Sequence, residues 1–334
     1  MVLSKRERLE KTIAGEATDR APVALWRHWP GDDQRPSDLV MSLQWFQQQW
    51  DFDFIHIAPS PSTTILDYGA QDAWQGDLKG YRYVTQRPIT RSLDWTELPI
   101  LDPQRGYLGQ LLEVMRLMDE AIKGPVPLVM TIYSPLSQAV LLAGETLLLK
   151  HLRQSPERLK TGLNTLMSNT LRFLDALQTS RVAGVCYMIT HADLQFLSVT
   201  EYETFGRVYD LQILETLPSQ WWLNIVNVQG KFPMMEVISS YPSQVLAWPA
   251  HLTDNFDLAS AKIARQGALY GGLDVEQDLH YGTPLKVRDQ ARHAFELVNN
   301  RRLILGTNSP LFVTTPQANI RATREAIDIS EKMG

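Results

Sequence analysis

Apolar runs rich in β-branched and aromatic residues alternate with helical patterns along the chain. Most of these runs are almost continuously apolar, which is typical of strands that are covered on both faces. Eight strands are predicted in this way: Pro22–Trp26, Asp53–Ala58, Pro127–Tyr133, Ala183–Ile189, Trp221–Val226, Gln244–Pro249, Ala268–Leu273 and Leu303–Gly306. Eight strands that alternate with helices predict an α/β fold, a closed parallel (β/α)8 or TIM barrel.

Helix start signals precede several of the helical patterns. Ser37 stands at a typical N-cap position, and Pro156, Pro284 and Pro316 stand where the first residue of a helix is expected. The helices predicted from these signals run over Ser37–Gln49, from Pro156 to about Gln178, over Leu285–Asn299 and over Gln317–Lys332.

One connection, between the second and third predicted strands, is unusually long. The segment from Ser60 to Gly124 has no strong periodicity, and we interpret it as an extended loop with short helices over the barrel mouth. An open doubly wound sheet is the alternative fold. It needs a glycine-rich phosphate loop after the first strand, and residues 26–30 (WRHWP) are not one. We therefore predict a single barrel domain over residues 1–334.

Composition and charge narrow the function. A net charge of -5 over 334 residues argues against general nucleic-acid binding, which needs a basic face. An anionic ligand is still compatible, because a few local arginines suffice to hold it. The only cysteine, Cys186, excludes an internal disulfide and a multi-cysteine metal site, and it fits a cytoplasmic protein. No apolar run approaches the roughly 20 residues of a membrane span, so we expect no membrane partner.

Short motifs occur along the chain in a fixed order. They are RERL at 6–9, GE at 15–16, DRAPV at 19–23, WDFDFI at 50–55, SPL at 134–136, GE at 144–145, GGLD at 271–274, GTP at 282–284, LG at 305–306 and TPQANI at 315–320. In this order and spacing they resemble the uroporphyrinogen decarboxylase superfamily over almost the whole chain. The resemblance implies a barrel of that type, and a homodimer is one candidate state because members are often dimers.

The superfamily holds two chemistries. Its decarboxylases remove acetate carboxyls from a tetrapyrrole without a cofactor. Its methyltransferases bind zinc through a His-x-Cys pair and a later cysteine, and they move methyl groups between a corrinoid protein and a thiol. At the first pair this chain has Asn227 and Gln229, and the third position falls near Asn308, within residues 307–309. Amides are poor zinc ligands, so we predict no metal and no cofactor.

The decarboxylase pattern is also incomplete. Of the arginine-rich element after the first strand, this chain keeps Arg27 alone. The essential aspartate after the second strand falls near Ser60, and the late Gly-His pair is Gly306-Thr307. The resemblance therefore identifies the superfamily and leaves its two activities as alternatives.

Four histidines lie at or near predicted strand ends: His28, His56, His191 and His251. In a barrel that edge is the active-site face, and imidazoles there can act as acids, bases or metal ligands. Polar caps on the barrel rim are the alternative interpretation. His191 is the first catalytic candidate, with Asp193 placed to orient it, whereas His56 also fits a position inside the second strand.

Arg27 at the end of the first strand suits a carboxylate clamp, or alternatively an ion pair with Asp32 or Asp33. Polar and aromatic side chains near the other strand ends suit ligand contacts, or alternatively loop bracing. The substrate-binding candidates are His28, His56, Ser60, Tyr133, Asn227, Gln229, His251, Asp274 and Asn308. We predict that Arg27, His191 and Asn227 face one shared pocket.

The first hypothesis for function is a cofactor-independent lyase of the uroporphyrinogen decarboxylase type. Arg27, His191 and Asp193 are its catalytic candidates, and the substrate is a small anionic molecule, with a tetrapyrrole or a corrinoid as candidates. Two alternatives remain. One is a corrinoid-linked methyltransferase without the zinc site, and the other is a ligand-binding barrel without catalysis.

Overall fold

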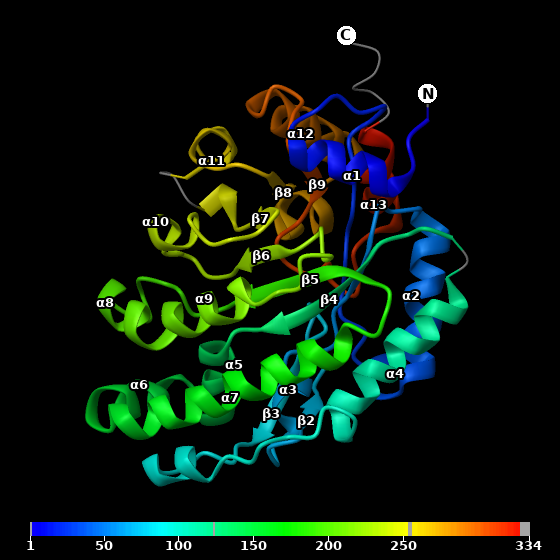
Figure 1. Cartoon of the computed structure of the whole chain (residues 1–334). Coiled ribbons are helices and arrows are strands. Elements are labelled where there is room, and N and C mark those ends of the chain that lie inside the picture. The colour runs from blue at the N-terminus through cyan, green and yellow to red at the C-terminus, as the bar shows by residue number, and fades with distance from the viewer. Residues whose placement is uncertain (1, 123, 253–255, 328–334) are drawn as a thin grey trace.

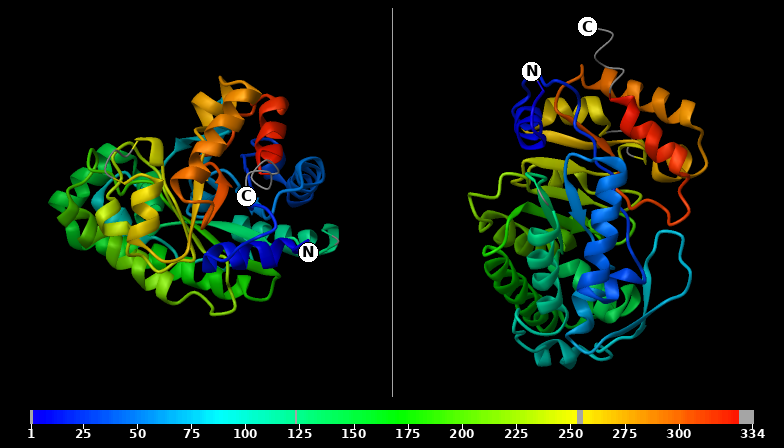
Figure 2. Two further views of the ribbon diagram at one scale, coloured as in Figure 1. Left: turned by 90° about the horizontal axis from the view of Figure 1, so that it is seen from above. Right: turned by 90° about the vertical axis from the view of Figure 1, so that its right-hand side faces the viewer.

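A parallel sheet of seven strands forms the centre of the computed structural model, which describes residues 2–122, 124–252 and 256–327. The strand order is β1-β4-β5-β6-β7-β8-β9, and the sheet is curled (Figures 1 and 2). The strands are β1 (Ile55–Ile57), β4 (Leu128–Tyr133), β5 (Val182–Ile189), β6 (Ile225–Val228), β7 (Val245–Ala247), β8 (Ala268–Gly272) and β9 (Leu303–Gly306). Each strand of the barrel pairs with the next one, as crossovers in an α/β barrel require.

Residues 22–26 close the sheet without forming a regular strand. On one side, the Ala24 N–H donates to Leu305 O at 3.0 Å and the Leu305 N–H donates to Pro22 O at 2.9 Å. On the other side, the Asp53 N–H donates to Val23 O at 2.8 Å, and the Asp53 carboxylate accepts from the Val23 N–H at 2.8 Å. The predicted α/β barrel is confirmed. The first of the eight predicted strands is wrong as a regular strand, because a side chain replaces part of its backbone ladder.

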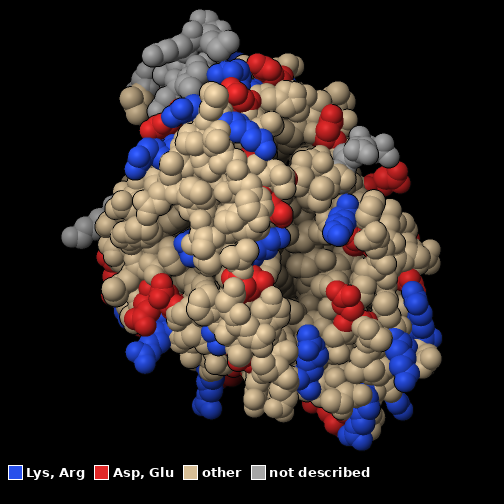
Figure 3. All heavy atoms as spheres, turned by 180° about the vertical axis from the view of Figure 1, so that it is seen from behind, with Lys and Arg blue, Asp and Glu red and all other residues tan. Residues whose placement is uncertain are grey.

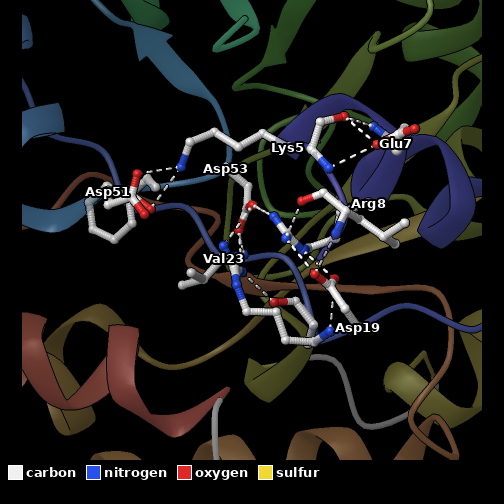
Figure 4. Close-up of polar contacts among 12 residues, drawn as sticks. Lys5, Glu7, Arg8, Asp19, Val23, Asp51 and Asp53 are labelled. Carbon is white, nitrogen blue, oxygen red and sulfur yellow. Dashed lines mark hydrogen bonds and ion pairs between the residues drawn. The ribbon is translucent and has the colours of Figure 1, made fainter. Parts of the chain in front are cut away.

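A buried ionic network fixes this closing segment (Figure 4). Asp53 has no exposed surface and pairs with Arg8 at 2.7 Å and with Arg20 at 2.8 Å. Arg8 lies in α1 (Lys5–Ala14) and also holds Asp19 through two hydrogen bonds of 2.8 Å. Removing one partner of such a network leaves a buried charge unpaired. The network therefore fixes α1 and residues 22–26 against Asp53, which lies just before β1.

Helices cover the outer face of the sheet (Figure 2). They are α2 (Pro36–Trp50), α4 (Gly106–Ala121), α5 (Pro135–Ala143), α6 (Glu145–Gln154), α7 (Pro156–Leu177), α8 (Val199–Tyr202), α9 (Val208–Glu215), α10 (Met235–Ile238), α11 (Leu258–Ala264), α12 (Pro284–Leu297) and α13 (Gln317–Ala326). The 3-10 turns are η1 (Asp32–Gln34), η2 (Ser92–Glu97) and η4 (Ala250–Leu252), and the π turns are η3 (Glu203–Arg207) and η5 (Val275–His280).

The proline signals found the helix starts more accurately than the serine signal did. Pro156 and Pro284 each begin their helix, as predicted, and Pro316 is an N-cap one position earlier than expected. Ser37 is not an N-cap, because Arg35 takes that position and Pro36 begins α2. The predicted end at Lys332 lies outside the described residues.

The connection between β1 and β4 differs from the expected loop with short helices. It holds α3 (Thr63–Leu66), an antiparallel hairpin of β2 (Gln71–Trp74) and β3 (Arg82–Gln86), the η2 turn and the helix α4. The 16-residue α4 packs along α2 as an ordinary outer helix. The hairpin loop reaches the mouth, where Leu78 O accepts a hydrogen bond from the Val313 N–H at 2.7 Å.

The surface carries charges of both signs. On the face shown in Figure 3, basic and acidic side chains are interspersed between uncharged ones. Among the described residues, no helix is both long enough and apolar enough to cross a bilayer.

Candidate functional site

A layer of aromatic and polar side chains lies inside the barrel near the carboxyl ends of the strands. The Trp26 ring lies 4.5 Å from the His56 ring and 5.5 Å from the His28 ring, measured between centroids. The Trp26 indole N–H donates to Thr307 O at 3.2 Å, and Tyr81 of the hairpin loop packs on His28 at 5.1 Å. Two of the predicted binding residues, His28 and His56, therefore share one layer.

Both of these histidines are buried and uncharged at neutral pH. Nδ1 of His28 donates to Ala58 O at 2.9 Å, because a carbonyl oxygen only accepts, and its Nε2 has no partner among the described residues. His56 lies inside β1, and its Nε2 shares a 2.8 Å hydrogen bond with Thr131 Oγ1. Burial lowers the pKa of His28 to about 4 and the pKa of His56 to about 3. Neither imidazole therefore suits proton transfer near pH 7.

Two side-chain amides at the end of β6 meet the backbone carbonyl of Asn308, which follows β9. Asn227, buried in β6, donates from Nδ2 to Asn308 O at 2.9 Å and accepts at Oδ1 from Gln229 Nε2 at 3.1 Å. Gln229 also donates to Asn308 O at 2.6 Å, and its Oε1 accepts from Ser309 Oγ at 3.3 Å. Asn227 and Asn308 are 81 residues apart in sequence. These are the positions that, by resemblance, correspond to the zinc ligands of the methyltransferases.

Tyr133 in β4 and Cys186 in β5 are both buried. Burial, with Tyr81 and Cys186 beside it, raises the pKa of Tyr133 well above its ordinary value. Burial also raises the pKa of the Cys186 thiol, which hydrogen-bonds with Asn227. Both groups therefore stay protonated at neutral pH, and Cys186 is the buried, small apolar residue expected inside its strand.

A cavity of about 220 Å³ lies beside the amides, where the ends of β7 and β8 meet α11 and α12. Its lining residues are Trp248, Ala250, His251, Asp257, Leu258, Gly271, Gly272, Leu273, Asp274, Asp278, Gln290, His293, Ala294, Leu297 and Asn308. Gly272 has a φ of +97°, and a Cβ there would lie 2.8 Å from the Cβ of Ala294 in α12. Only glycine fits this wall without moving the helix. Asn308 connects the cavity to the amide cluster.

His251 and Asp274 form a pair at the edge of this cavity. His251 Nε2 lies 3.2 Å from Asp274 Oδ2, and the His251 side chain is 39% exposed. The other carboxylate oxygen, Oδ1, accepts from the backbone N–H groups of Glu276 at 2.7 Å and Gln277 at 3.1 Å, where η5 begins. An ionised carboxylate only accepts, so neutral His251 carries its proton on Nε2 and its lone pair on Nδ1. An imidazole oriented by a fixed carboxylate is suited to proton transfer.

Arg27, one of the three catalytic candidates, lies away from the amides. Its guanidinium stacks on the Trp29 ring at 4.6 Å, and Trp29 in turn packs on Phe46 of α2. Burial lowers the pKa of Arg27, although Asp32 acts in the opposite direction. Within the described part of the chain Arg27 forms no ion pair with Asp32 or Asp33, the alternative suggested by its sequence neighbours.

The other two catalytic candidates do not contact each other. His191 shares a 2.6 Å hydrogen bond with Thr190 Oγ1 and lies 3.8 Å from Glu145. The Asp193 carboxylate instead accepts from the backbone N–H groups of Gln195 at 2.7 Å and Phe232 at 2.9 Å. Asp193 therefore braces the loops after β5 and β6. None of the four cavities lined by Trp248, Tyr68, Trp26 and Thr12, respectively, has Arg27, His191 and Asn227 together in its lining.

Ser60 has a structural environment at the same mouth. Its N–H donates to Asp33 Oδ2 at 3.0 Å, and its Oγ lies 3.0 Å from Ser62 Oγ. Sequence reasoning missed two cavity residues of α12, Gln290 and His293. They stand three positions apart on one helix face, and this spacing was the available signal. The described residues bring together no group of three or more His, Cys, Asp or Glu side chains with metal-site geometry.

Comparisons with solved structures give the same architecture. A methyltransferase from Methanosarcina mazei is similar with a TM-score of 0.86 at 16% sequence identity, over 98% of this chain and 99% of that one. A B12-independent methionine synthase from Shewanella sp. W3-18-1, in complex with selenomethionine, is similar with a TM-score of 0.54 at 13% identity, over 94% of each chain. A putative vitamin-B12 independent methionine synthase from Listeria monocytogenes has a TM-score of 0.51 at 12% identity, over 89% of this chain and 87% of that one.

At these identities the likeness shows the fold alone. No curated protein matches the sequence. The family comparison is more specific, and it agrees with the resemblance that the ordered motifs carry. The sequence model of the uroporphyrinogen decarboxylase (URO-D) family matches residues 70–329, and the chain therefore belongs to that family.

Proposed function

We propose that this chain is a methyl-transfer enzyme of its family that works without zinc. The observation that carries this proposal is the convergence of Asn227, Gln229 and Asn308 in one hydrogen-bonded cluster. Asn227, Gln229 and a position near Asn308 correspond by resemblance to the zinc ligands of the methyltransferase branch, and here the two side-chain amides meet at the backbone carbonyl of Asn308. The likeness to a methyltransferase over 98% of the chain supports the same choice.

The decarboxylase hypothesis has less support from the geometry. Holding a substrate with several carboxylates requires cations that face the ligand. The guanidinium of Arg27 stacks on Trp29, and the described cavity beside the amides is lined by Asp257, Asp274 and Asp278 without lysine or arginine. Methyl transfer makes no such demand on the protein.

Under this proposal the chain's own residues bind and orient a methyl acceptor. The amide cluster supplies polar contacts beside the cavity, and the apolar walls of Trp248, Leu258 and Leu273 exclude water from it. A methylated corrinoid, bound as co-substrate, supplies a methyl group on cobalt. The acceptor must then lose a proton, and under this proposal it does so without zinc.

The test is a pair of assays on the same purified chain. Methylcobalamin with 2-mercaptoethanol should be demethylated, with loss of its absorbance and formation of the thioether, and a zinc chelator should leave the rate unchanged. Uroporphyrinogen should release no carbon dioxide. Release of carbon dioxide without methyl transfer would reverse the assignment to decarboxylase, and inactivity in both assays would favour the ligand-binding barrel.

A second experiment tests the correspondence with the zinc site directly. Asn227→His combined with Gln229→Cys, and with a cysteine at position 307, 308 or 309, should convert the amide cluster into a zinc site. Elemental analysis should then give about one zinc per chain in at least one of the three triple variants. The matched control replaces Ser62 and Thr64 by cysteine, away from the cluster. If no triple variant retains more zinc than this control, the correspondence is wrong.

A further inference from the structure

We propose that His251 is the general base of this methyl transfer, that Asp274 is its positioning residue, and that the acceptor in the adjoining cavity is an uncharged or cationic thiol. This inference rests on the proposed function and adds to it the catalytic base and the substrate class. It also answers how an acceptor loses its proton in a site that has no zinc.

The geometry of the pair supports this role. Asp274 is held by two backbone N–H groups through one oxygen, so its other oxygen stays aimed at His251 Nε2 at 3.2 Å. The pair comes from two different loops, after β7 and after β8, and both residues line the 220 Å³ cavity. The N-cap role of Asp274 at the start of η5 explains why its carboxylate is fixed, and the cavity that both residues line gives this oriented pair a place where an acceptor can bind.

The charges around the cavity define the acceptor. Its titratable lining residues are Asp257, Asp274, Asp278, His251 and His293. Lys286 reaches Asp278 at 3.3 Å from outside the lining, and among the described residues neither Asp257 nor Asp274 pairs with a lysine or an arginine. An anionic acceptor would be repelled here, whereas a neutral or cationic one would be accepted. The cavity also has apolar walls and a small volume, which suit a short acceptor.

The acceptor is a thiol because of the strength of the base. A thiol ionises near pH 8.5, which is far closer to the range of an imidazole than the ionisation of an alcohol, so proton transfer to histidine is feasible. In the proposed step, Nδ1 of His251 takes the S–H proton while the sulfur lone pair forms a new S–CH3 bond. The carbon–cobalt bond of the methylcorrinoid breaks, and both of its electrons remain on cobalt as Co(I). The proton then leaves His251 to solvent, and atoms and electrons balance.

Three variants test the base with methylcobalamin and 2-mercaptoethanol. His251→Gln should lower kcat roughly 100-fold or more at pH 7, within the usual range for a positioned acid or base. Asp274→Asn should lower kcat roughly tenfold, and Asp274→Glu should recover part of that loss. Glu296→Gln is the matched control, because it removes an exposed charge on α12 at a position outside the cavity lining, and it should keep the wild-type rate.

The pH profile separates a base from a structural role. A rate that depends on a base should fall at acid pH in the wild type, and the His251→Gln variant should lack this acid limb. Its deficit should also shrink at alkaline pH, because a growing share of 2-mercaptoethanol is then ionised without a base. A deficit that stays constant from pH 6 to 9 would mean that His251 acts on folding or binding, and the inference would be wrong.

A series of three thiols tests the substrate class. Cysteamine and 2-mercaptoethanol should exceed 3-mercaptopropionate by roughly tenfold in kcat/KM, because the carboxylates repel the anion. Preference for 3-mercaptopropionate would overturn this part. The two proposals fail differently: a wild-type chain that methylates none of the three thiols defeats the proposed function, whereas full activity in His251→Gln with an active wild type defeats only the inference.

Discussion

The molecule holds histidines in two contrasting environments. His28 and His56 are sealed inside the barrel against Trp26, and each has one ring nitrogen without a partner in the described structure. His251 lies at the rim, 39% exposed, beside a fixed carboxylate and in the lining of a cavity. The same residue type is therefore held neutral in one region and placed for proton exchange in the other.

The difference shows that position at a strand end is not enough to make a histidine catalytic. Burial removes water from both protonation states, and it penalises the charged state far more. A histidine inside the barrel consequently loses the ability to titrate near pH 7, which a base requires. At the rim, by contrast, the imidazole of His251 is partly exposed and lies 3.2 Å from the Asp274 carboxylate.

The largest expected effect concerns the sealed histidines. The folded-state pKa of His56, about 3, lies below the ordinary value of 6.5, so the unfolded chain binds more protons between these limits. Stability from this group is present above pH 6.5 and is lost as the pH falls, by an amount on the order of 5 kcal/mol. The double variant His56→Leu/Thr131→Val should remove this loss, because it replaces both hydrogen-bonded partners by apolar groups.

Urea unfolding from pH 7 down to pH 4 provides the measurement. The wild type should lose stability more steeply than the double variant over this range. If stability falls equally with pH in the two proteins, His56 has the same protonation in the folded and the unfolded state. His56 would then not differ from His251 in the way described above.

The buried carboxylate of Asp210 should change the stability in the opposite direction as the pH changes. Asp210 in α9 is fully buried and accepts from Tyr187 at 2.8 Å, Tyr202 at 2.6 Å and Tyr241 at 3.3 Å. Burial raises its pKa to about 6 from an ordinary 3.8. The folded state therefore binds the proton more tightly, and stability from this group is lost as the pH rises from about 3.8 to 6, by roughly 3 kcal/mol.

Asp210→Asn should remove this loss. The difference in unfolding free energy, wild type minus variant, should decrease as the pH rises from 4 to 7. An increase over that range would show that the three hydroxyl groups outweigh burial and hold the carboxylate ionised. Thermal scans at matched ionic strength give the same comparison independently.

The smallest expected effect is on the stability of the rim. His251→Gln should change the free energy of unfolding by no more than about 0.5 kcal/mol, because the side chain is partly exposed and its partner Asp274 keeps two backbone donors. Urea unfolding at pH 7 is the check. A loss of several kcal/mol would place His251 with the structural histidines and remove the distinction between the two regions.

Local sequence signals carried much of the fold. Continuous apolar runs located β4, β5, β8 and β9 to within one or two residues, because strands covered on both faces exclude polar side chains. Proline fixed the starts of α7 and α12, because it has no N–H to leave unpaired at a first turn. Residues 22–26 were predicted as a strand because they too form an apolar run. No local signal shows that the Asp53 carboxylate replaces part of the backbone hydrogen-bond ladder of this segment.

The candidate site was only partly predictable. His251, Asp274 and Asn308 were each expected near the mouth, from their positions after predicted strands, and each lines the same cavity. The pairing of His251 with Asp274 was not foreseen, and His191 with Asp193 was expected in its place. Adjacency in sequence favoured that second pair, but Asp193 turns to the backbone of Gln195 and Phe232.

The sequence by itself determined the alternation of buried strands and helices, the family and the set of polar residues at the strand ends, because these depend on local patterns and ordered motifs. Only the tertiary structure decided which of those residues meet. Strand register and loop path turn Asn227 toward Asn308 across 81 residues and bring the loops after β7 and β8 side by side. A hydrogen bond forms only when its two atoms are about 3 Å apart. The packing of segments that are distant in sequence therefore decides which polar residues form a site.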